Sequence, residues 1–243
     1  RFSAAMVDFG KGEADRFAGK GTERRFHLSR LPREYYKGDA VVHWTLPVAR
    51  RGKGWLNESF HETFRELMLH AVAREGMFCP AYCLMPDHIH LVWMGLRRNS
   101  DQRNGMTFLR TYLEPKLAPM KFQHQAHDHV LKDEDRRRNA FARVCHYVLA
   151  NPVRAELVKH PAEWKFSGAV VPGYPTLHSL RDDFWKKFWK LYNDAKHPDA
   201  GDILRPPSQY LVCYIVLDRR ARSHKLCHAG DGGGRGDVLG VPG

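Results

Sequence analysis

Hydrophobic positions in the middle of the chain follow two periodicities, which predict strands and helices in turn. Residues 41–46 are β-branched or bulky and stop at Pro47, a pattern typical of a strand. Between Ser59 and Gly76 apolar residues recur at helical spacing, and Ser59 and Glu62 have the spacing of a capping box. This pattern predicts an amphipathic helix, whose apolar stripe must be covered by a sheet or by another helix.

A hairpin is predicted directly after this helix. Two apolar runs, 78–85 and 88–94, are separated only by Pro86 and Asp87, which are common turn residues. Four further elements follow: a helix over about 107–117 interrupted by Pro115, a short strand over 129–131, a helix over about 135–150 and an aromatic helix over 184–192. The order of these elements predicts an α+β fold with helices on one face of an antiparallel sheet.

Shifts in composition divide the chain into four parts. We expect a basic N-terminal arm over 1–38, a folded domain over 39–172, an aromatic C-terminal helix over 173–199 and a poorly patterned, disordered tail over 200–243. The tail ends in a stretch, 231–243, that contains six glycines.

The charge balance narrows the class of partner. The chain carries 39 Lys and Arg against 27 Asp and Glu, a formal net charge of +12. This charge favours a polyanionic partner, and nucleic acid comes first because phosphate contacts supply most non-specific affinity. An anionic membrane surface would attract the same charge, but the longest apolar run, 210–217, is far shorter than the roughly 20 residues of a spanning helix. We therefore expect no membrane association.

The cysteines and the first residues indicate the compartment. The cysteines form an odd set of five without the spacing of a disulfide framework: Cys79, Cys83, Cys145, Cys213 and Cys227. No secretory apolar segment opens the sequence. Both observations favour a reducing, cytoplasmic location.

His88 and His90 are the first candidates for chemistry. They lie two residues apart in a predicted strand, so the strand period points both imidazoles to one face and the intervening Ile89 to the other. Two imidazoles on one strand face could coordinate a metal ion together. Taken alone, however, two histidines on a solvated strand face are commoner than a metal site.

A second candidate group lies near the end of the predicted helix. Tyr147 and Asn151 are four residues apart, so on a continuing helix the phenol and the amide share a face. Pro152 disfavours helical geometry at Asn151, so the helix is expected to end near there. The two side chains share a face only if the last turn of the helix includes Asn151.

Two motifs around these residues resemble a known family. They read YCLMPDHIHLV at 82–92 and YVLANPVRA at 147–155. In length and order they are similar to the motifs of the HUH single-tyrosine transposases, especially the branch of REP-associated tyrosine transposases (RAYT). Weaker similarity extends over about 38–167. The first strand departs from the pattern, because 42–47 reads VHWTLP where many relatives carry a basic residue near the strand end.

The resemblance implies an HUH endonuclease fold of the ferredoxin/RRM-like type and a DNA transposition or recombination activity. It implies a divalent metal on His88 and His90, with Asn151 at the position of the third polar ligand, and Tyr147 as a nucleophile that forms a 5′-phosphotyrosine. The implied partner is DNA, single-stranded or in hairpin repeat palindromes, bound in the nucleoid by a monomer or a homodimer.

These residue types suit that chemistry. A phenol with a pKa of about 10 is mostly protonated at neutral pH and needs a base or a nearby cation to become nucleophilic. A metal would polarise the scissile phosphate. Two imidazoles and an amide are unusual ligands for Mg²⁺ and fit Mn²⁺ at least as well, so Mg²⁺ and Mn²⁺ both stay open.

Basic residues near the tyrosine are candidates for DNA contacts. Arg136, Arg137 and Arg138 open the predicted tyrosine helix and could grip phosphates, although such a run is usually a solvated face. Arg154 could also meet a phosphate, but pairing with Glu156 or with a helix end is an equal alternative.

Other clusters have less specific patterns. His127 and His129 form a second H-x-H for which a polar strand edge is the simpler interpretation. Cys79 and Cys83 with the two histidines lack paired zinc spacing. His224, Cys227 and His228 form a further, weak cluster. The aromatic residues of 184–192 could stack on bases, but aromatic residues at helical spacing more often belong to a hydrophobic core.

Two rival functions stay open. One is a non-catalytic protein that binds repeat hairpins and derives from such a transposase, against which the intact His88, His90 and Tyr147 argue. The other is a replication-initiation or relaxase-type HUH nuclease, whose motifs usually come in another order in a larger chain.

Overall fold

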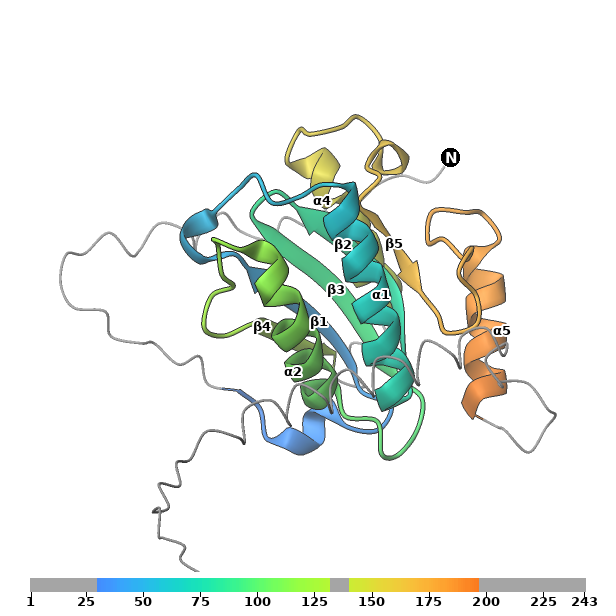
Figure 1. Ribbon diagram of the computed structural model, residues 1–243. Coiled ribbons are helices and arrows are strands. Elements are labelled where there is room, and N and C mark those ends of the chain that lie inside the picture. Colours follow the sequence, from blue (N-terminus) through green and yellow to red (C-terminus); the bar gives the residue numbers. More distant parts are fainter. Residues whose placement is uncertain (1–29, 132–139, 197–243) are drawn as a thin grey trace, which may run out of the picture.

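A five-stranded antiparallel sheet forms the centre of the molecule (Figure 1). The structure is a computed structural model that describes residues 30–131 and 140–196. The strands are β1 (Val41–Pro47), β2 (Met77–Met85), β3 (His88–Gly95), β4 (His127–Leu131) and β5 (Ser167–Val170). Their order across the sheet is β4-β1-β3-β2-β5.

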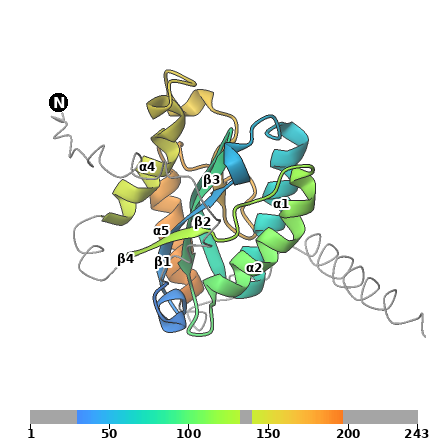
Figure 2. The same cartoon turned by 90° about the vertical axis from the view of Figure 1, so that its left-hand side faces the viewer.

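Helices cover both faces of this sheet. The helices are α1 (Glu58–Glu75), α2 (Gln102–Leu113), α4 (Ala140–Arg154) and α5 (Phe184–Lys196). Figure 2 shows α1 and α2 on one side of the strands and α4 and α5 on the other. Short 3-10 turns complete the described elements: Arg33–Tyr36, Ala49–Arg51, Glu114–Leu117 and Pro161–Glu163.

The topology confirms the predicted α+β class with an antiparallel sheet. The order β4-β1-β3-β2, with α1 after β1 and α2 after β3, is the ferredoxin-like arrangement, and β5 extends it beside β2. The expectation that helices lie on only one face is wrong. All nine positions of β2 and seven of the eight in β3 are buried, so both faces of the sheet are apolar and both require a cover.

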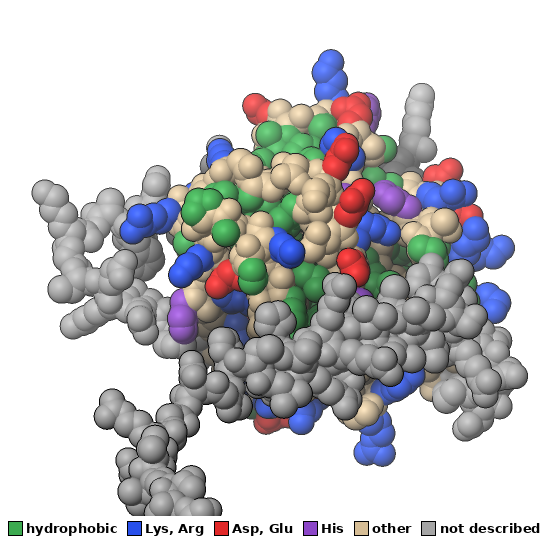
Figure 3. Space-filling model, viewed as in Figure 1, with side chains coloured by type: hydrophobic (Ala, Val, Ile, Leu, Met, Phe, Trp, Pro, Cys, Tyr) green, Lys and Arg blue, Asp and Glu red, His purple; other side chains and the backbone are tan. Residues whose placement is uncertain are grey.

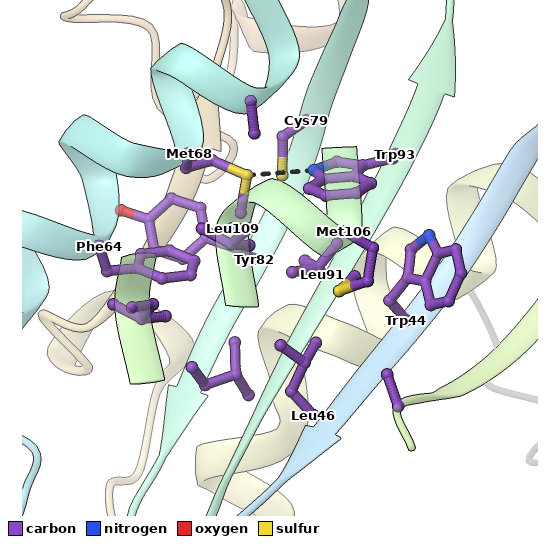
Figure 4. Close-up of a cluster of buried hydrophobic side chains, with 14 of the residues drawn as sticks. Trp44, Leu46, Phe64, Met68, Cys79, Tyr82, Leu91, Trp93, Met106 and Leu109 are labelled. Carbon is purple, nitrogen blue, oxygen red and sulfur yellow. Dashed lines mark hydrogen bonds between the residues drawn. The ribbon is translucent and has the colours of Figure 1, made fainter. Parts of the chain in front are cut away.

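The face under α1 and α2 holds the larger core (Figure 4). Trp44, Trp93 and Phe64 are fully buried there. Both indole N–H groups have a partner: that of Trp93 lies 3.1 Å from the Met68 sulfur, and that of Trp44 donates to the Gln102 side chain at 3.0 Å. These bonds remove the cost of burying an unpaired indole N–H.

The opposite face holds the second core, between the sheet and α4 and α5. Phe184 and Phe188 are fully buried and stack with ring centroids 5.5 Å apart, and Phe188 also stacks on Phe141 of α4. The aromatic stripe of α5 is therefore core, as its helical spacing favours, while Trp189 keeps 39% of its surface exposed.

Helix boundaries depend on caps that the hydrophobic pattern did not identify. The cap of α1 is Asn57, whose side chain accepts a hydrogen bond from the backbone N–H of Phe60 at 2.9 Å, so the predicted capping box at Ser59 is wrong. The helix ends, as predicted, just before Gly76, its C-cap, which has a φ of 62°. Helix α2 begins at Gln102, about five residues earlier than predicted, because Asp101 caps it.

Helix α4 runs through Pro152 and ends at Arg154, whereas the proline was expected to disfavour helical geometry at Asn151. Proline has no N–H to donate to the carbonyl of Val148 four residues earlier. The Asn151 side-chain amide takes its place, donating to the Val148 carbonyl at 3.3 Å and to the Tyr147 carbonyl at 2.9 Å. This local substitution keeps Tyr147 and Asn151 on one continuous helix.

Candidate active site

The two histidines of β3 converge on one face of the sheet. Their Nε2 atoms lie 2.9 Å apart, and the rings are nearly perpendicular. Val92, two residues further along the same strand face, packs in the core beneath α4. The predicted placement of both imidazoles on one face of the strand is confirmed, and that face lies toward α4, which carries Tyr147.

Asp87 holds the ring of His88. Its Oδ1 lies 2.6 Å from His88 Nδ1, and its other oxygen pairs with Arg51 at 3.1 Å. Burial opposes ionisation of Asp87, but the hydrogen bond from His88 and the charges of His88 and Arg51 outweigh it and lower the pKa of this carboxyl. An ionised carboxylate can only accept, so Nδ1 of His88 carries a proton, and in the neutral ring Nε2 is then the nitrogen with a lone pair.

His90 lies deeper than His88 and is held from β1. Its Nδ1 is 3.1 Å from Thr45 Oγ1 and 3.1 Å from His43 Nε2. Burial, followed by the charges of His43, His88 and Arg154, lowers the pKa of His90 to about 2. Burial and the nearby His129 lower the pKa of His43 to about 4. Both rings are therefore neutral at neutral pH, which is the form that binds metals.

Tyr147 reaches the histidines from α4. Its ring centroid lies 6.2 Å from that of His90 and 6.0 Å from that of His43, in edge-on contacts. Cys145 and Val148 are buried against the sheet, so Tyr147 lies at the rim of the helix and keeps 38% of its surface exposed. The phenol thus stands beside the histidines and is open to a substrate.

The remaining predicted site residues have different environments. Arg154 lies on α4 with its guanidinium carbon 4.6 Å from the Tyr147 ring centroid, in place of the alternative pairing with Glu156. Asn151 is half-buried beside Tyr147, and its amide nitrogen bonds its own helix, so the amide oxygen is the atom that could bind a cation. The run 136–138, with its three arginines, lies outside the described residues.

The donor set fits a divalent ion held by two imidazoles. Ligand nitrogens at about 2.0 to 2.1 Å from a metal lie roughly 3 Å apart when the metal angle is near 90°, close to the 2.9 Å between the two Nε2 atoms. The carboxylate behind His88 is the usual support for a metal-bound histidine. Within 30–131 and 140–196, no group of three or more His, Cys, Asp or Glu side chains gathers into a metal site. Among the described residues, a third ligand would therefore come from outside these four residue types, as the Asn151 amide does.

The alternative zinc set is not assembled. Cys79 packs in the core under α1 and Cys83 in the core under α4, because the register shifts between Phe78 and Ala81 and turns the two thiols to opposite faces. Burial raises the pKa of the Cys83 thiol to about 12, so it is protonated rather than a thiolate ligand.

The second H-x-H lies on the edge strand β4. His127 and His129 are both exposed and pair across β1 with Thr45 and His43. Their exposure agrees with a polar strand edge. The cluster of His224, Cys227 and His228 lies outside the described residues.

Sequence reasoning missed two residues beside the tyrosine. His43 touches both His90 and Tyr147. Its signal is the strand period: His43 and Thr45 are two residues apart and share a face of β1, and Thr45 pairs with His90. Arg143 is exposed one helical turn before Tyr147, a spacing that could have been read from the sequence.

A separate basic groove runs along α2 on the other side of the sheet. Arg30, Arg103, Arg110 and Lys121 line it. Two of these arginines already have partners within the protein: Arg30 forms an ion pair with Asp128, and Arg110 donates to the backbone carbonyl of Gln123. Figure 3 shows basic and acidic side chains interspersed on the part of this face that other atoms leave in view.

Membrane-spanning potential can be judged for the described helices. None of those within 30–131 and 140–196 combines the length and the apolar character that crossing a membrane requires.

Comparison with known proteins finds a likeness in structure. No protein-family model and no curated protein sequence matches this chain. Among solved structures, the chain is similar to a REP-associated tyrosine transposase bound to a REP hairpin, with 20% sequence identity and a TM-score of 0.47. The match covers 58% of this chain and 82% of that one. At this identity and TM-score the likeness assigns no activity, so function must be argued from the site residues.

Proposed function

We propose that this chain is a metal-dependent tyrosine transposase or endonuclease that cleaves and rejoins single-stranded or hairpin DNA. The observation that carries the proposal is the edge-on contact of the exposed Tyr147 ring with His90, whose Nε2 lies 2.9 Å from that of His88. A solvent-accessible phenol beside two imidazoles that are held by hydrogen bonds has the composition of a nucleophile next to a cation site.

The reaction is a transesterification at one phosphodiester. The Tyr147 oxygen bonds to phosphorus, the bond from phosphorus to the 3′ oxygen breaks, and the 3′ oxygen takes up a proton to leave as a hydroxyl. The phenol proton passes to solvent. The product is a 5′-phosphotyrosine, which keeps the phosphoester bond energy so that a 3′ hydroxyl can reverse the step and rejoin the strand.

Four side chains would assist Tyr147 in this step. His88 and His90, with the Asn151 amide oxygen, would hold a divalent ion, Mn²⁺ or Mg²⁺. When bound, that ion supplies a Lewis acid for the scissile phosphate. The positive charge of Arg154 beside the tyrosine ring would orient the phosphate for attack. The net charge of +12 favours the approach of DNA.

The proposal is tested by cleavage of an end-labelled single-stranded hairpin with the full-length chain. Wild-type protein with Mn²⁺ should cut the strand, and a chelator should stop cutting. His88→Ala with His90→Ala should reduce cleavage steeply, and added Mn²⁺ should not restore it.

The second H-x-H offers a matched control. His127→Ala with His129→Ala removes two exposed imidazoles from the neighbouring edge strand and should leave cleavage intact. Equal loss in both double variants, or cutting by the His88 and His90 variant at the wild-type rate, would overturn the proposed role of the pair. DNA binding without cutting under every metal condition would favour the non-catalytic alternative.

A further inference from the structure

The hydrogen-bond partners of the histidine pair restrict which nitrogen carries each proton. Asp87 lies at Nδ1 of His88 as an acceptor, so in a neutral His88 ring the lone pair is on Nε2, which lies 2.9 Å from Nε2 of His90. If His90 is also to present a lone pair to a cation, its single proton must move to Nδ1, because a neutral imidazole carries only one N–H. That proton then needs an acceptor on the far side of the ring.

Strand β1 provides two groups at the required position. Thr45 Oγ1 and His43 Nε2 both lie 3.1 Å from Nδ1 of His90. The Thr45 hydroxyl can donate or accept and rotates freely, so it does not select one tautomer. His43 can accept only when its own proton is on Nδ1, which makes it a directional partner.

His43 also touches the tyrosine. Its ring lies edge-on to Tyr147 at a centroid distance of 6.0 Å and tilted to His90 at 5.1 Å. The His43 side chain is half-buried and contacts both α4, which carries Tyr147, and β3, which carries His90. One side chain on β1 therefore contacts both halves of the site.

We propose that His43 is a positioning residue, which accepts the Nδ1 proton of His90 and so directs the Nε2 of His90 toward a divalent cation. This inference rests on the proposed function. His43 would also keep the Tyr147 ring at its present separation from His90. Loss of the acceptor would weaken cation binding, while loss of the ring would also loosen the tyrosine.

Direct titration of the full-length chain with Mn²⁺ tests this role without any measurement of activity. His43→Phe keeps a ring beside Tyr147 but removes the acceptor, and Mn²⁺ affinity should fall about 10- to 100-fold, as for other groups that support metal-bound histidines. His43→Gln restores an acceptor oxygen and should recover part of the loss. His129→Phe, at the cross-strand neighbour of His43, should bind Mn²⁺ as the wild type does.

Imidazole NMR of the wild-type protein saturated with diamagnetic Zn²⁺ gives an independent readout and does not depend on the folding of any variant. Long-range coupling of ring protons to nitrogen should place the proton of His90 on Nδ1 and that of His43 on Nδ1.

The outcomes separate this inference from the proposed function. Absence of Mn²⁺ binding by the wild type would overturn both. Wild-type binding that is unchanged in His43→Phe, or a Zn²⁺-loaded wild type with the His43 proton on Nε2, would overturn only the positioning role.

Discussion

The guanidinium carbon of Arg154 lies 4.6 Å from the ring centroid of Tyr147, two helical turns earlier on α4. The contact places a permanent positive charge against the ring of the proposed nucleophile. Because Arg154 is exposed, its remaining donors are accessible to a phosphate.

Replacement of Arg154 should slow cleavage more than it destabilises the fold. A hydrogen bond to a charged group contributes about 1.5 to 3 kcal/mol, so Arg154→Ala should reduce the cleavage rate by roughly 10- to 150-fold. Arg154→Lys keeps the charge and should lose less. The exposed Arg98 follows the opposite end of β3 from His88, and Arg98→Ala is the control that should cleave normally. Single-turnover rates on a labelled hairpin measure the effect, and equal rates for Arg154→Ala and Arg98→Ala would contradict it.

Asn151 should stabilise the fold by supplying the helical hydrogen bond that Pro152 cannot make. The amide of Asn151 serves the Val148 carbonyl, which the proline leaves without its helical donor. Asn151→Ala should therefore cost about 0.5 to 1.5 kcal/mol of unfolding free energy, and this cost should shrink when Pro152→Ala restores a backbone N–H. Urea unfolding of the four proteins in this double-mutant cycle measures the coupling. Strictly additive effects would show that the side chain does not replace the missing bond.

DNA binding should weaken with salt. Displaced counterions make the logarithm of affinity fall with the logarithm of salt concentration, by about 0.7 per phosphate contact on a single strand. Arg154→Ala should reduce this slope by about one contact, and a hairpin should compete better than plain duplex. Fluorescence anisotropy across a salt series gives the slope. A flat dependence would mean that phosphate contacts do not drive binding.

His61 should make stability depend on pH. Burial, followed by the charges of Arg65, His178 and Lys165, lowers the pKa of His61 to about 4, and its Nε2 lies 2.9 Å from the Tyr82 hydroxyl. The unfolded chain, with an ordinary histidine pKa near 6.5, binds this proton first as pH falls. The unfolding free energy should therefore decrease between about pH 6.5 and 4 and level off below that range.

Comparison with His61→Gln isolates this contribution from those of the other histidines. The greatest slope for one group is about 1.4 kcal/mol per pH unit, and solvent screening lowers it here because the ring is only partly buried. Urea unfolding at pH 7, 6 and 5 should show a shallower decline in His61→Gln. His146→Gln, at an exposed position of α4, should keep the wild-type decline. Identical slopes in wild type and His61→Gln would refute the role of this ring.

Local periodicity was sufficient to predict part of the site. The strand period placed His88 and His90 on one face, and helical spacing placed Tyr147 and Asn151 together. Both predictions concern neighbours within one element, where side-chain direction follows directly from backbone geometry.

The missed features depend on how separate elements meet. His43 joins the site only because β1 pairs with β3 in a register that sets Thr45 opposite His90, and hydrophobic patterning does not specify pairing partners. The second helical layer was missed for a similar reason, since a fully apolar strand such as β2 indicates burial on both faces but not which helices cover each. The effect of Pro152 was misjudged because a side chain supplied the missing donor.

Covalent capture of the DNA strand by Tyr147 tests the central claim most directly. Full-length protein is incubated with end-labelled single-stranded hairpin DNA and Mn²⁺ and resolved on a denaturing gel, with Tyr112→Phe as a control at another exposed tyrosine, on α2. The wild type and Tyr112→Phe should form the adduct, whereas Tyr147→Phe should bind DNA without forming it, because only the attacking hydroxyl is lost. An adduct that persists in Tyr147→Phe would show that another residue attacks and would contradict the account.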